Sequence, residues 1–289
     1  MNGSEVNDLA YTLKLAQTLN GAGGMPIFLD IFYGDTWSNQ TMPEAWRDLD
    51  FESLKSAVYK YTADVLSEFH RLKINISMVQ VGNEIDGGLM WPAGRLYERP
   101  GAKGEFAKFS ALLKEGIRAV RDSAYGNTAK VVLQLKEGGK WGDTEYFMRH
   151  VLAHGVQFDA LGLSYYPWWQ GPIDNLVHNV ENVARHFPNH EVVIAEVGFL
   201  WLPCLFHESD GLSSEEGHYP EEYQVSPQGQ YGLLLELCSR MKRQPNVKAI
   251  FYWTPESINA GDIGHLPYSL CHWNGTVLKG MQAFADCAC

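Results

Sequence analysis

Residues 76–84 read Ile-Ser-Met-Val-Gln-Val-Gly-Asn-Glu, and residues 191–198 read Glu-Val-Val-Ile-Ala-Glu-Val-Gly. Each is a short, apolar, β-branched run, which is typical of a strand buried on both faces in a parallel sheet. Each also carries a carboxylate, Glu84 or Glu196, where an unpaired charge would be costly. The two stretches therefore predict buried strands, and we expect Glu84 and Glu196 each to have either a partner or a function.

Strand-like and helix-like segments alternate along the rest of the chain without a linker. The predicted strands are Met25–Phe32, Ile76–Asn83, Lys130–Leu135, Ala160–Pro167, Glu191–Gly198 and Lys248–Pro255. Apolar residues recur at helical spacing within residues 51–72, 106–120, 173–187 and 231–241. This alternation predicts an α/β fold, a TIM (β/α)8-type barrel in a single domain over residues 1–289, with about six of the eight βα units visible.

The beginning of the chain is expected to lack part of that barrel. A helix-like stretch, Asp8–Asn20, precedes the first predicted strand and is followed by Gly21-Ala-Gly-Gly24. In a βα barrel such a helix follows a strand, and none precedes it here. We therefore expect the first two strands to be missing from the 289-residue sequence.

Composition narrows the function classes. The chain has 23 Lys and Arg against 34 Asp and Glu, a net charge of −11, which disfavours a nucleic-acid partner. No window approaches 18 consecutive apolar residues, so no membrane-spanning helix is predicted. No phosphate-binding loop or nucleophile elbow lies between a strand and a helix, so no cofactor is expected.

The signals for a cellular compartment conflict. Residues 1–8 carry acids and no basic segment followed by an apolar run, so they predict no signal peptide and, taken literally, a cytoplasmic protein. Asn-x-Ser/Thr sequons, which matter in secreted chains, are nevertheless more frequent than expected by chance. They lie at Asn2, Asn39, Asn75 and Asn274.

The cysteines lie in the last third of the chain and are odd in number. They are Cys204, Cys238, Cys271, Cys287 and Cys289. A structural bridge or inert thiols are favoured over a metal site, because no pair has the spacing of zinc ligands. The histidines near acids, His207, His218, His265 and His272, are irregularly spaced, and no metal is predicted.

The two carboxylates suggest a glycosidase. Strand ends converge at one mouth of a βα barrel, so Glu84 and Glu196 are predicted to face each other across it. Paired carboxylates cleave glycosidic bonds, one as proton donor and the other as nucleophile. The alternative is that each is a paired core or rim residue. Aromatic residues that could stack on sugars are frequent at the strand ends: Trp37, Trp91, Tyr165, Tyr166, Trp168, Trp169, Trp201, Tyr252 and Trp253.

At these residues the sequence resembles the family 53 glycoside hydrolases, the endo-β-1,4-galactanases, from about Asp8 to the C-terminus. The motifs that carry the resemblance are Val79-Gln-Val-Gly-Asn-Glu84, Gly88-Leu-Met-Trp91-Pro-Ala-Gly94, Asp35-Thr-Trp37-Ser, Pro43-Glu-Ala-Trp46, Gly162-Leu-Ser-Tyr165-Tyr166-Pro167 and Phe251-Tyr-Trp253-Thr-Pro255. The family belongs to a clan of retaining barrels with two catalytic glutamates. The resemblance implies a secreted, monomeric hydrolase of β-1,4-galactan in pectic polysaccharide.

The resemblance also implies roles for individual residues. Glu84 would be the general acid/base and Glu196 the nucleophile. Asn83 would hydrogen-bond the sugar 2-hydroxyl, and Tyr166, with Tyr165 as second choice, would orient the nucleophile. Trp253 would form the floor of the subsite that holds the reacting sugar, and Asp35, Trp37 and Trp91 would line the cleft. By the same resemblance, Cys204 and Cys271 could pair.

Three departures from the family pattern concern the site. A clan Arg near the nucleophile belongs to the strands that are expected to be missing. A family His on strand three is replaced by Phe32, and the family's His-Leu-Asp on strand five reads Gln134-Leu135-Lys136. We expect these changes to alter the rim that faces the sugar. The alternatives to a galactanase are a catalytically inactive carbohydrate-binding protein, an endo-mannanase or endo-glucanase of the same clan, and a barrel without sugar binding.

Overall fold

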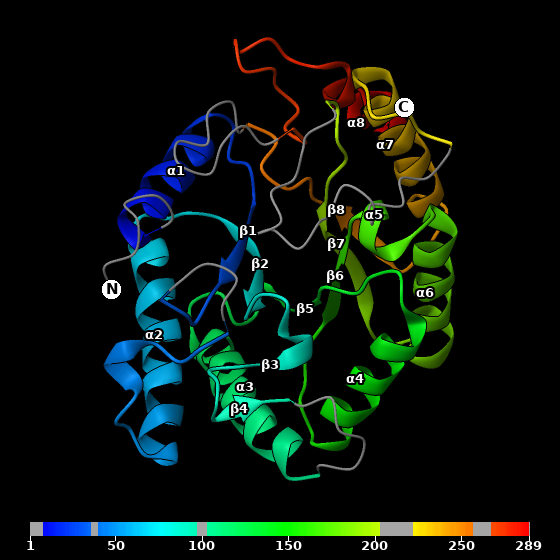
Figure 1. Ribbon diagram of the computed structural model, residues 1–289. Coiled ribbons are helices and arrows are strands. Elements are labelled where there is room, and N and C mark those ends of the chain that lie inside the picture. The colour runs from blue at the N-terminus through cyan, green and yellow to red at the C-terminus, as the bar shows by residue number, and fades with distance from the viewer. Residues whose placement is uncertain (1–7, 36–39, 97–102, 203–221, 257–266, 289) are drawn as a thin grey trace. The chain divides into compact units, whose positions relative to one another are not determined.

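The computed structural model describes residues 8–35, 40–96, 103–202, 222–256 and 267–288. The chain divides into two compact units. Figure 1 labels helices and strands of both. Unit 1 comprises Met1–Leu135 and Tyr146–Leu161, and unit 2 comprises Lys136–Glu145 and Gly162–Cys289. The single domain over residues 1–289 stays a prediction.

The main sheet contains the six predicted strands, in the order β1-β2-β5-β6-β7-β8. They are β1 (Ile27–Ile31), β2 (Ile76–Val81), β5 (Lys130–Leu135), β6 (Ala160–Tyr165), β7 (Glu191–Val197) and β8 (Val247–Ile250). In unit 1, β2 lies parallel to both β1 and β5, and in unit 2, β7 lies parallel to β8. The α/β class and the six strands are confirmed.

The largest difference between a predicted and an observed strand boundary is at the end of the last strand. The sequence predicted a strand over Lys248–Pro255, but β8 ends at Ile250, although the Phe251 and Trp253 N–H groups still donate to the Ile194 and Val197 carbonyls of β7. Thr254 has φ of 46°, in the left-handed region, so the chain turns away from the strand direction there. The aromatic residues Tyr252 and Trp253 therefore belong to the loop that leaves the strand.

The helices of unit 1 begin at acidic caps that the sequence offers. The Asp8 carboxylate accepts from the Tyr11 amide at the start of α1 (Leu9–Gly21), and the Asp50 carboxylate accepts from the Ser53 amide at the start of α2 (Phe51–Arg71). Helix α3 (Lys103–Asp122) packs along α2, and α4 (Trp141–Ala153), which the sequence analysis did not name, begins in unit 2.

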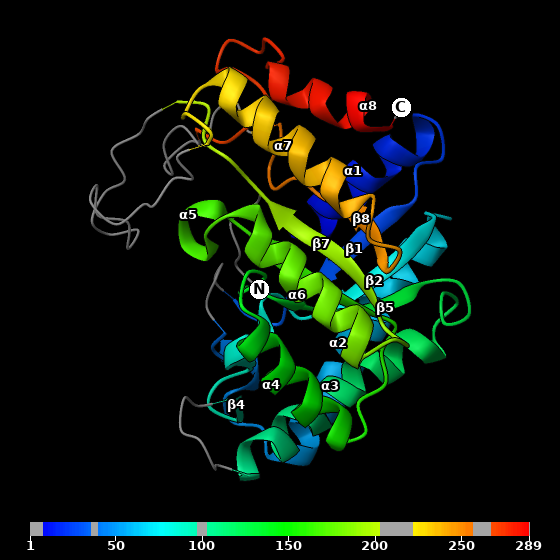
Figure 2. The same ribbon diagram turned by 90° about the vertical axis from the view of Figure 1, so that its right-hand side faces the viewer.

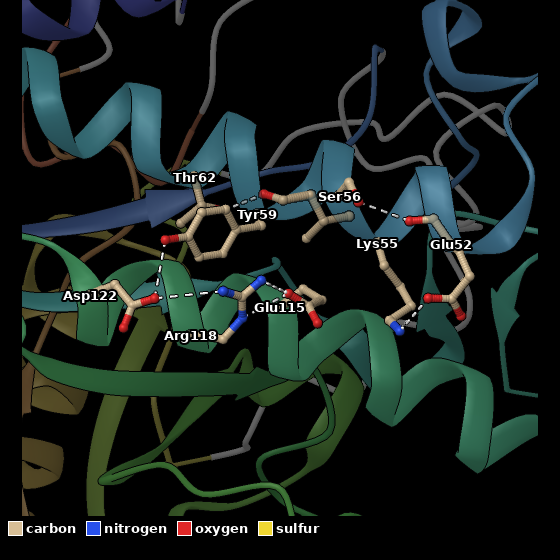
Figure 3. Close-up of polar contacts among 9 residues, drawn as sticks. Glu52, Lys55, Ser56, Tyr59, Thr62, Glu115, Arg118 and Asp122 are labelled. Carbon is tan, nitrogen blue, oxygen red and sulfur yellow. Dashed lines mark hydrogen bonds and ion pairs between the residues drawn. The ribbon is translucent and has the colours of Figure 1, made fainter.

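Buried apolar side chains and an exposed polar network hold α2 against α3. Val58 and Phe69 of α2 and Phe109 and Leu113 of α3 are fully buried. On the exposed side, the Tyr59 hydroxyl donates to Asp122, and the Arg118 guanidinium lies 3.9 Å from the Tyr59 ring centroid (Figure 3). Exposed ion pairs contribute little to stability, so the buried face carries most of this packing.

The helices of unit 2 are α5 (Pro167–Gln170), α6 (Ile173–His186), α7 (Pro227–Met241) and α8 (Gln282–Ala288). Helix α6 has the amphipathic pattern predicted for residues 173–187, with Leu176, Val180 and Val183 fully buried. Helices α7 and α8 lie side by side (Figure 2). None of the described helices is long and apolar enough to cross a membrane.

A disulfide joins α7 to α8, between Cys238 and Cys287. This bridge agrees with the preference for a structural bridge over a metal site, but the pairing differs from the one that the family resemblance implied. Cys204 lies outside the described residues, and Cys271 is a free thiol among those described. The bridge closes a loop of 49 residues. A crosslink of that length stabilises the fold by about 4 kcal/mol, mainly by restricting the unfolded chain.

A small antiparallel ribbon follows β2 in unit 1 and was not predicted from the sequence. It pairs β3 (Gly88–Leu89) with β4 (Gly94–Arg95). Gly88 has φ of +93°, and a Cβ on this residue would lie 2.1 Å from the Gly94 carbonyl oxygen. Only glycine fits at this position without moving the ribbon.

We expect Gly88→Ala to lower the free energy of unfolding by about 2–4 kcal/mol, since it adds both backbone strain and a steric clash. Gly142→Ala is the matched control, because a Cβ at Gly142 meets nothing within 4 Å. Urea unfolding of the two variants measures the difference. Equal unfolding midpoints would contradict the close approach of Gly88 to Gly94.

Candidate active site

The candidate acid Glu84 lies just beyond the end of β2, in an unusual backbone conformation. Its φ and ψ are 46° and 61°, in the left-handed region. The preceding Gly82 also has positive φ, and a Cβ there would lie 2.7 Å from the Ile85 side chain. The chain therefore turns sharply between the end of β2 and Glu84. Both Asn83 and Glu84 are half-buried.

Two glutamine side chains, Gln40 and Gln134, contact the backbone of this turn, and a third, Gln80, contacts Gln134. The Gln40 amide nitrogen donates to the Asn83 carbonyl at 2.6 Å. The side-chain oxygen of Gln134 accepts from the Gln80 amide at 2.6 Å and from the Glu84 backbone N–H at 3.3 Å. Gln80 and Gln134 are 2% and 1% exposed, on strands β2 and β5. Buried amides that are paired in this way fix one geometry, because leaving them unpaired is costly.

We expect Gln134→Leu to lower the free energy of unfolding by about 1–3 kcal/mol, since it leaves the Gln80 amide and the Glu84 N–H without their acceptor. Gln134→Leu should also lower activity, and adding Gln80→Leu should recover part of the stability but not the activity, because the Gln134 acceptor of the Glu84 N–H is still missing. Gln134→His, which restores a ring-nitrogen acceptor, should retain activity. Urea unfolding measures the change in stability, and initial rates of the hydrolysis predicted from the sequence measure the change in activity. Full activity in Gln134→Leu would contradict the positioning of Glu84 by Gln134.

The loop after Glu84 fixes Trp91. The indole N–H of Trp91 donates to the Gly87 carbonyl at 2.9 Å, and the Arg95 guanidinium lies 4.2 Å from the Trp91 ring centroid. The Trp91 backbone bridges to Thr41, so the predicted cleft residue is held on several sides. Asp35 is exposed and its carboxylate accepts from the Glu44 amide at 2.6 Å. Trp37 lies outside the described residues.

The candidate nucleophile Glu196 lies near the end of β7 in unit 2. The Tyr166 hydroxyl donates to Glu196 Oε2 at 2.7 Å. The Tyr165 hydroxyl instead donates to the Gly171 carbonyl at 2.7 Å, and burial raises the pKa of Tyr165 above its usual value. Alternation along β6 explains the difference, since consecutive side chains at a strand end point to opposite faces. Of the two tyrosines considered, Tyr166 contacts the carboxylate.

The position of Tyr166 is set by packing around it. Its backbone N–H donates to the side-chain oxygen of Gln170, whose amide nitrogen donates to the Lys136 carbonyl at 2.7 Å. The Tyr166 ring packs against Trp168, with 5.3 Å between centroids. A Cβ at Gly198 would lie 3.0 Å from the Tyr166 ring, so the absence of a side chain at Gly198 leaves room for Tyr166.

We expect Tyr166→Phe to lower kcat/KM by about 10- to 100-fold, because a hydrogen bond to a charged group is worth about 1.5–3 kcal/mol. The ring and its packing are retained in this variant. Tyr165→Phe is the matched control: it removes a buried hydroxyl one residue away and should change stability more than rate. Equal loss of kcat/KM in the two variants would contradict a specific contact between Tyr166 and Glu196.

Aromatic side chains continue from this strand end in unit 2. Trp253 is half-buried, and its ring centroid lies 5.3 Å from that of Tyr268. Trp169 is 53% exposed and packs edge-on to Tyr166. Such rings offer apolar faces to sugars, as predicted for this edge of the sheet.

Sequence reasoning did not identify the glutamines that support both carboxylates. Gln134 was noted only as a departure from the family His, and Gln40, Gln80 and Gln170 were not named. A signal was available for Gln80 and Gln134, because each is an amide inside an otherwise apolar strand and such groups need a partner. Among the described residues, no group of three or more His, Cys, Asp or Glu side chains could hold a metal ion.

Comparison with known sequences decides the family. A sequence profile of Glycosyl hydrolase family 53 matches residues 1–285. The chain belongs to glycosyl hydrolase family 53. This family 53 member is therefore a glycoside hydrolase by descent, and the resemblance stated from its motifs is confirmed.

Relatives of this family 53 chain include fungal galactanases. It is 32% identical over 266 residues to the arabinogalactan endo-β-1,4-galactanase A of Aspergillus niger, covering 89% of this chain and 72% of the relative. It is 33% identical over 255 residues to an uncharacterized protein of Niallia circulans, covering 84% of this chain and 68% of the relative.

Solved structures agree with the family 53 assignment. The chain is similar to a fungal β-1,4-galactanase, with a TM-score of 0.81, 25% identity and coverage of 99% of this chain and 85% of that one. It is similar to the family 53 catalytic domain of Ignisphaera aggregans, with a TM-score of 0.81, 28% identity and coverage of 96% and 78%. A xylanase of Thermotoga maritima, at 15% identity and a TM-score of 0.65, shares the fold. The predicted TIM-barrel class is confirmed.

Proposed function

We propose that this protein is a retaining endo-β-1,4-galactanase that hydrolyses galactan or arabinogalactan side chains of pectin. The observation that carries the proposal is the 2.7 Å hydrogen bond from Tyr166 to the strand-end carboxylate Glu196, in a chain of family 53. A donor on one carboxylate oxygen holds the other oxygen in a fixed direction for attack. The galactanases among the relatives support β-1,4-galactan as the substrate.

In this mechanism the two glutamates have different roles. Glu196 attacks the anomeric carbon while Glu84 protonates the leaving oxygen, which forms a covalent glycosyl-enzyme and releases the first product. Glu84, now ionised, then removes a proton from water, and the resulting attack regenerates Glu196. Double displacement in this way retains the anomeric configuration.

Other side chains hold the sugar in this proposal. Asn83 hydrogen-bonds the 2-hydroxyl of the reacting sugar, and Trp253 supports its ring. Asp35, Trp37 and Trp91 line the cleft that receives the polymer, and Tyr165 acts through its buried hydrogen bond to the Gly171 carbonyl rather than on the substrate. The protein acts as a monomer and needs no cofactor or metal.

Release of reducing ends from purified β-1,4-galactan tests the proposal. We expect a fall in chain length before galactose accumulates, which distinguishes an endo-acting enzyme, and no comparable release from mannan, β-glucan or xylan. Proton NMR of the first products should show the β-anomer. A folded protein that binds galactan but releases no reducing ends would instead identify a non-catalytic carbohydrate-binding protein, and release from mannan or β-glucan would identify a different hydrolase of the clan.

We also propose that the protein is secreted. The Cys238–Cys287 disulfide supports this, because structural disulfides form and persist mainly in oxidising compartments. Of the two sequons within the described residues, the one at Asn274 is exposed throughout, as carbohydrate attachment in a secretory pathway requires, whereas the one at Asn75 includes the buried Ile76 of β2.

A further inference from the structure

An exposed tight turn follows β8 in unit 2, between residues 271 and 277. Cys271 and Val277 form an antiparallel bridge, and the His272 N–H donates to the Thr276 carbonyl at 2.8 Å. The Gly275 N–H donates back to the His272 carbonyl at 2.8 Å, and Gly275 has φ of +83°. These bonds define a hairpin with its tip at Asn274 and Gly275, and they place Asn274 and Thr276 on the surface.

The tip reads Asn274-Gly275-Thr276, which is an acceptor sequence for N-linked carbohydrate. The Asn274 side-chain oxygen accepts from the Thr276 N–H at 2.9 Å. This contact holds the amide of residue 274 and the threonine of residue 276 on one compact loop. All three residues of the sequon are exposed, so a glycan can be attached without opening the turn.

We propose that Asn274 carries an N-linked glycan when the chain passes through a eukaryotic secretory pathway. The reaction joins the Asn274 amide nitrogen to the anomeric carbon of an oligosaccharide carried on a lipid diphosphate. A C–N bond forms as the sugar–phosphate C–O bond breaks, the amide nitrogen loses one proton, and the lipid diphosphate leaves. No oxidant, reductant or further reactant is required.

Two independent features make this turn suited to the modification. The Cys238–Cys287 bridge lies in the same unit and forms in the same oxidising compartment in which N-glycans are attached. Trp273, which precedes the acceptor, is 51% exposed. Its ring centroid lies 4.0 Å from that of His272 and 5.6 Å from that of Trp201. Its exposed part offers the first sugar an apolar surface next to the attachment point.

Peptide mapping of the secreted chain tests the proposal. The full 289-residue chain, fused to a secretion leader, is produced in yeast, and only protein recovered from the medium is used. Treatment with peptide N-glycosidase in water enriched in heavy oxygen converts a glycosylated Asn into labelled Asp. We expect labelled Asp at position 274 and a shift to lower apparent mass on the same treatment.

Variants at residue 276 supply the control. Thr276→Ala keeps Asn274 but removes the hydroxyl of the sequon, and it should abolish the label at position 274, whereas Thr276→Ser should keep it. The measured quantity is a peptide mass, which does not depend on galactanase activity. The result therefore tests the glycan independently of the proposed function. Unlabelled Asn274 in protein recovered from the medium, or labelling that persists in Thr276→Ala, would overturn the proposal.

Discussion

Glu196→Gln is expected to lower the turnover of β-1,4-galactan by roughly 10⁴- to 10⁶-fold, the range seen when a nucleophile is removed from an enzyme that forms a covalent intermediate. The side chain keeps its size and can still accept from the Tyr166 hydroxyl, which contacts Glu196 at 2.7 Å in the native chain. The loss therefore reports the missing negative charge rather than altered packing. Initial rates of reducing-end release measure it.

The control for this variant lies on the same strand. Glu191→Gln changes the acid that begins β7, at the opposite end of the strand from Glu196, and should leave the rate within a few-fold. Azide gives a second test: in Glu196→Gly, azide can attack in place of the carboxylate, and the product should be the α-galactosyl azide, because one displacement inverts the centre. A rate in Glu196→Gln close to that of the native protein would remove Glu196 from the mechanism.

Much of the sheet could be predicted because its strands are buried on both faces. Lys130–Leu135 and Ala160–Tyr165 are mostly apolar runs between turn residues, and the sequence placed the start of each at the observed residue. The end of the last strand was predicted too far along the chain, because Phe251, Tyr252 and Trp253 have the composition of a strand although they follow its last residue, Ile250. Composition alone does not distinguish a strand from an aromatic loop that packs against its neighbours.

The supporting groups of the site were harder to predict than its carboxylates. Glu84 and Glu196 stand out because a charge in an apolar strand needs a reason. Gln134 stands out less, since an amide carries no charge, and its contact with the Glu84 N–H depends on the left-handed turn at Glu84 and on the alignment of two strands. A pairing between residues 50 positions apart is a property of the folded sheet rather than of a local pattern.

The pairing of the cysteines also could not be predicted from the sequence alone. Five cysteines permit several pairings, and only the packing of α7 against α8 brings Cys238 and Cys287 together. Spacing along the chain carries no information about which helices are neighbours. The family resemblance implied that Cys204 and Cys271 could pair, and this stays a prediction, because Cys204 lies outside the described residues.

Glu84→Gln is expected to have an effect that depends on the leaving group. With galactan, departure of a sugar alcohol needs the proton that Glu84 is proposed to supply, and we expect a loss of about 10²- to 10⁴-fold, the usual contribution of a general acid. With an aryl galactobioside whose phenol leaves without protonation, the first step should remain nearly as fast as in the native protein. The second step should then become limiting, because no base activates water, and a burst of phenol should precede slow turnover.

The burst separates the two glutamates, since Glu196→Gln should show none with either substrate. Azide should accelerate turnover of the aryl substrate by Glu84→Gln and give the β-galactosyl azide, the opposite anomer to that from Glu196→Gly, because the covalent intermediate still forms. Asp86→Asn, two residues along in the short helix η2 (Ile85–Gly87), is the matched control and should show neither behaviour. A loss in Glu84→Gln that is equal for galactan and the aryl substrate would mean that residue 84 binds or positions the sugar and does not transfer the proton.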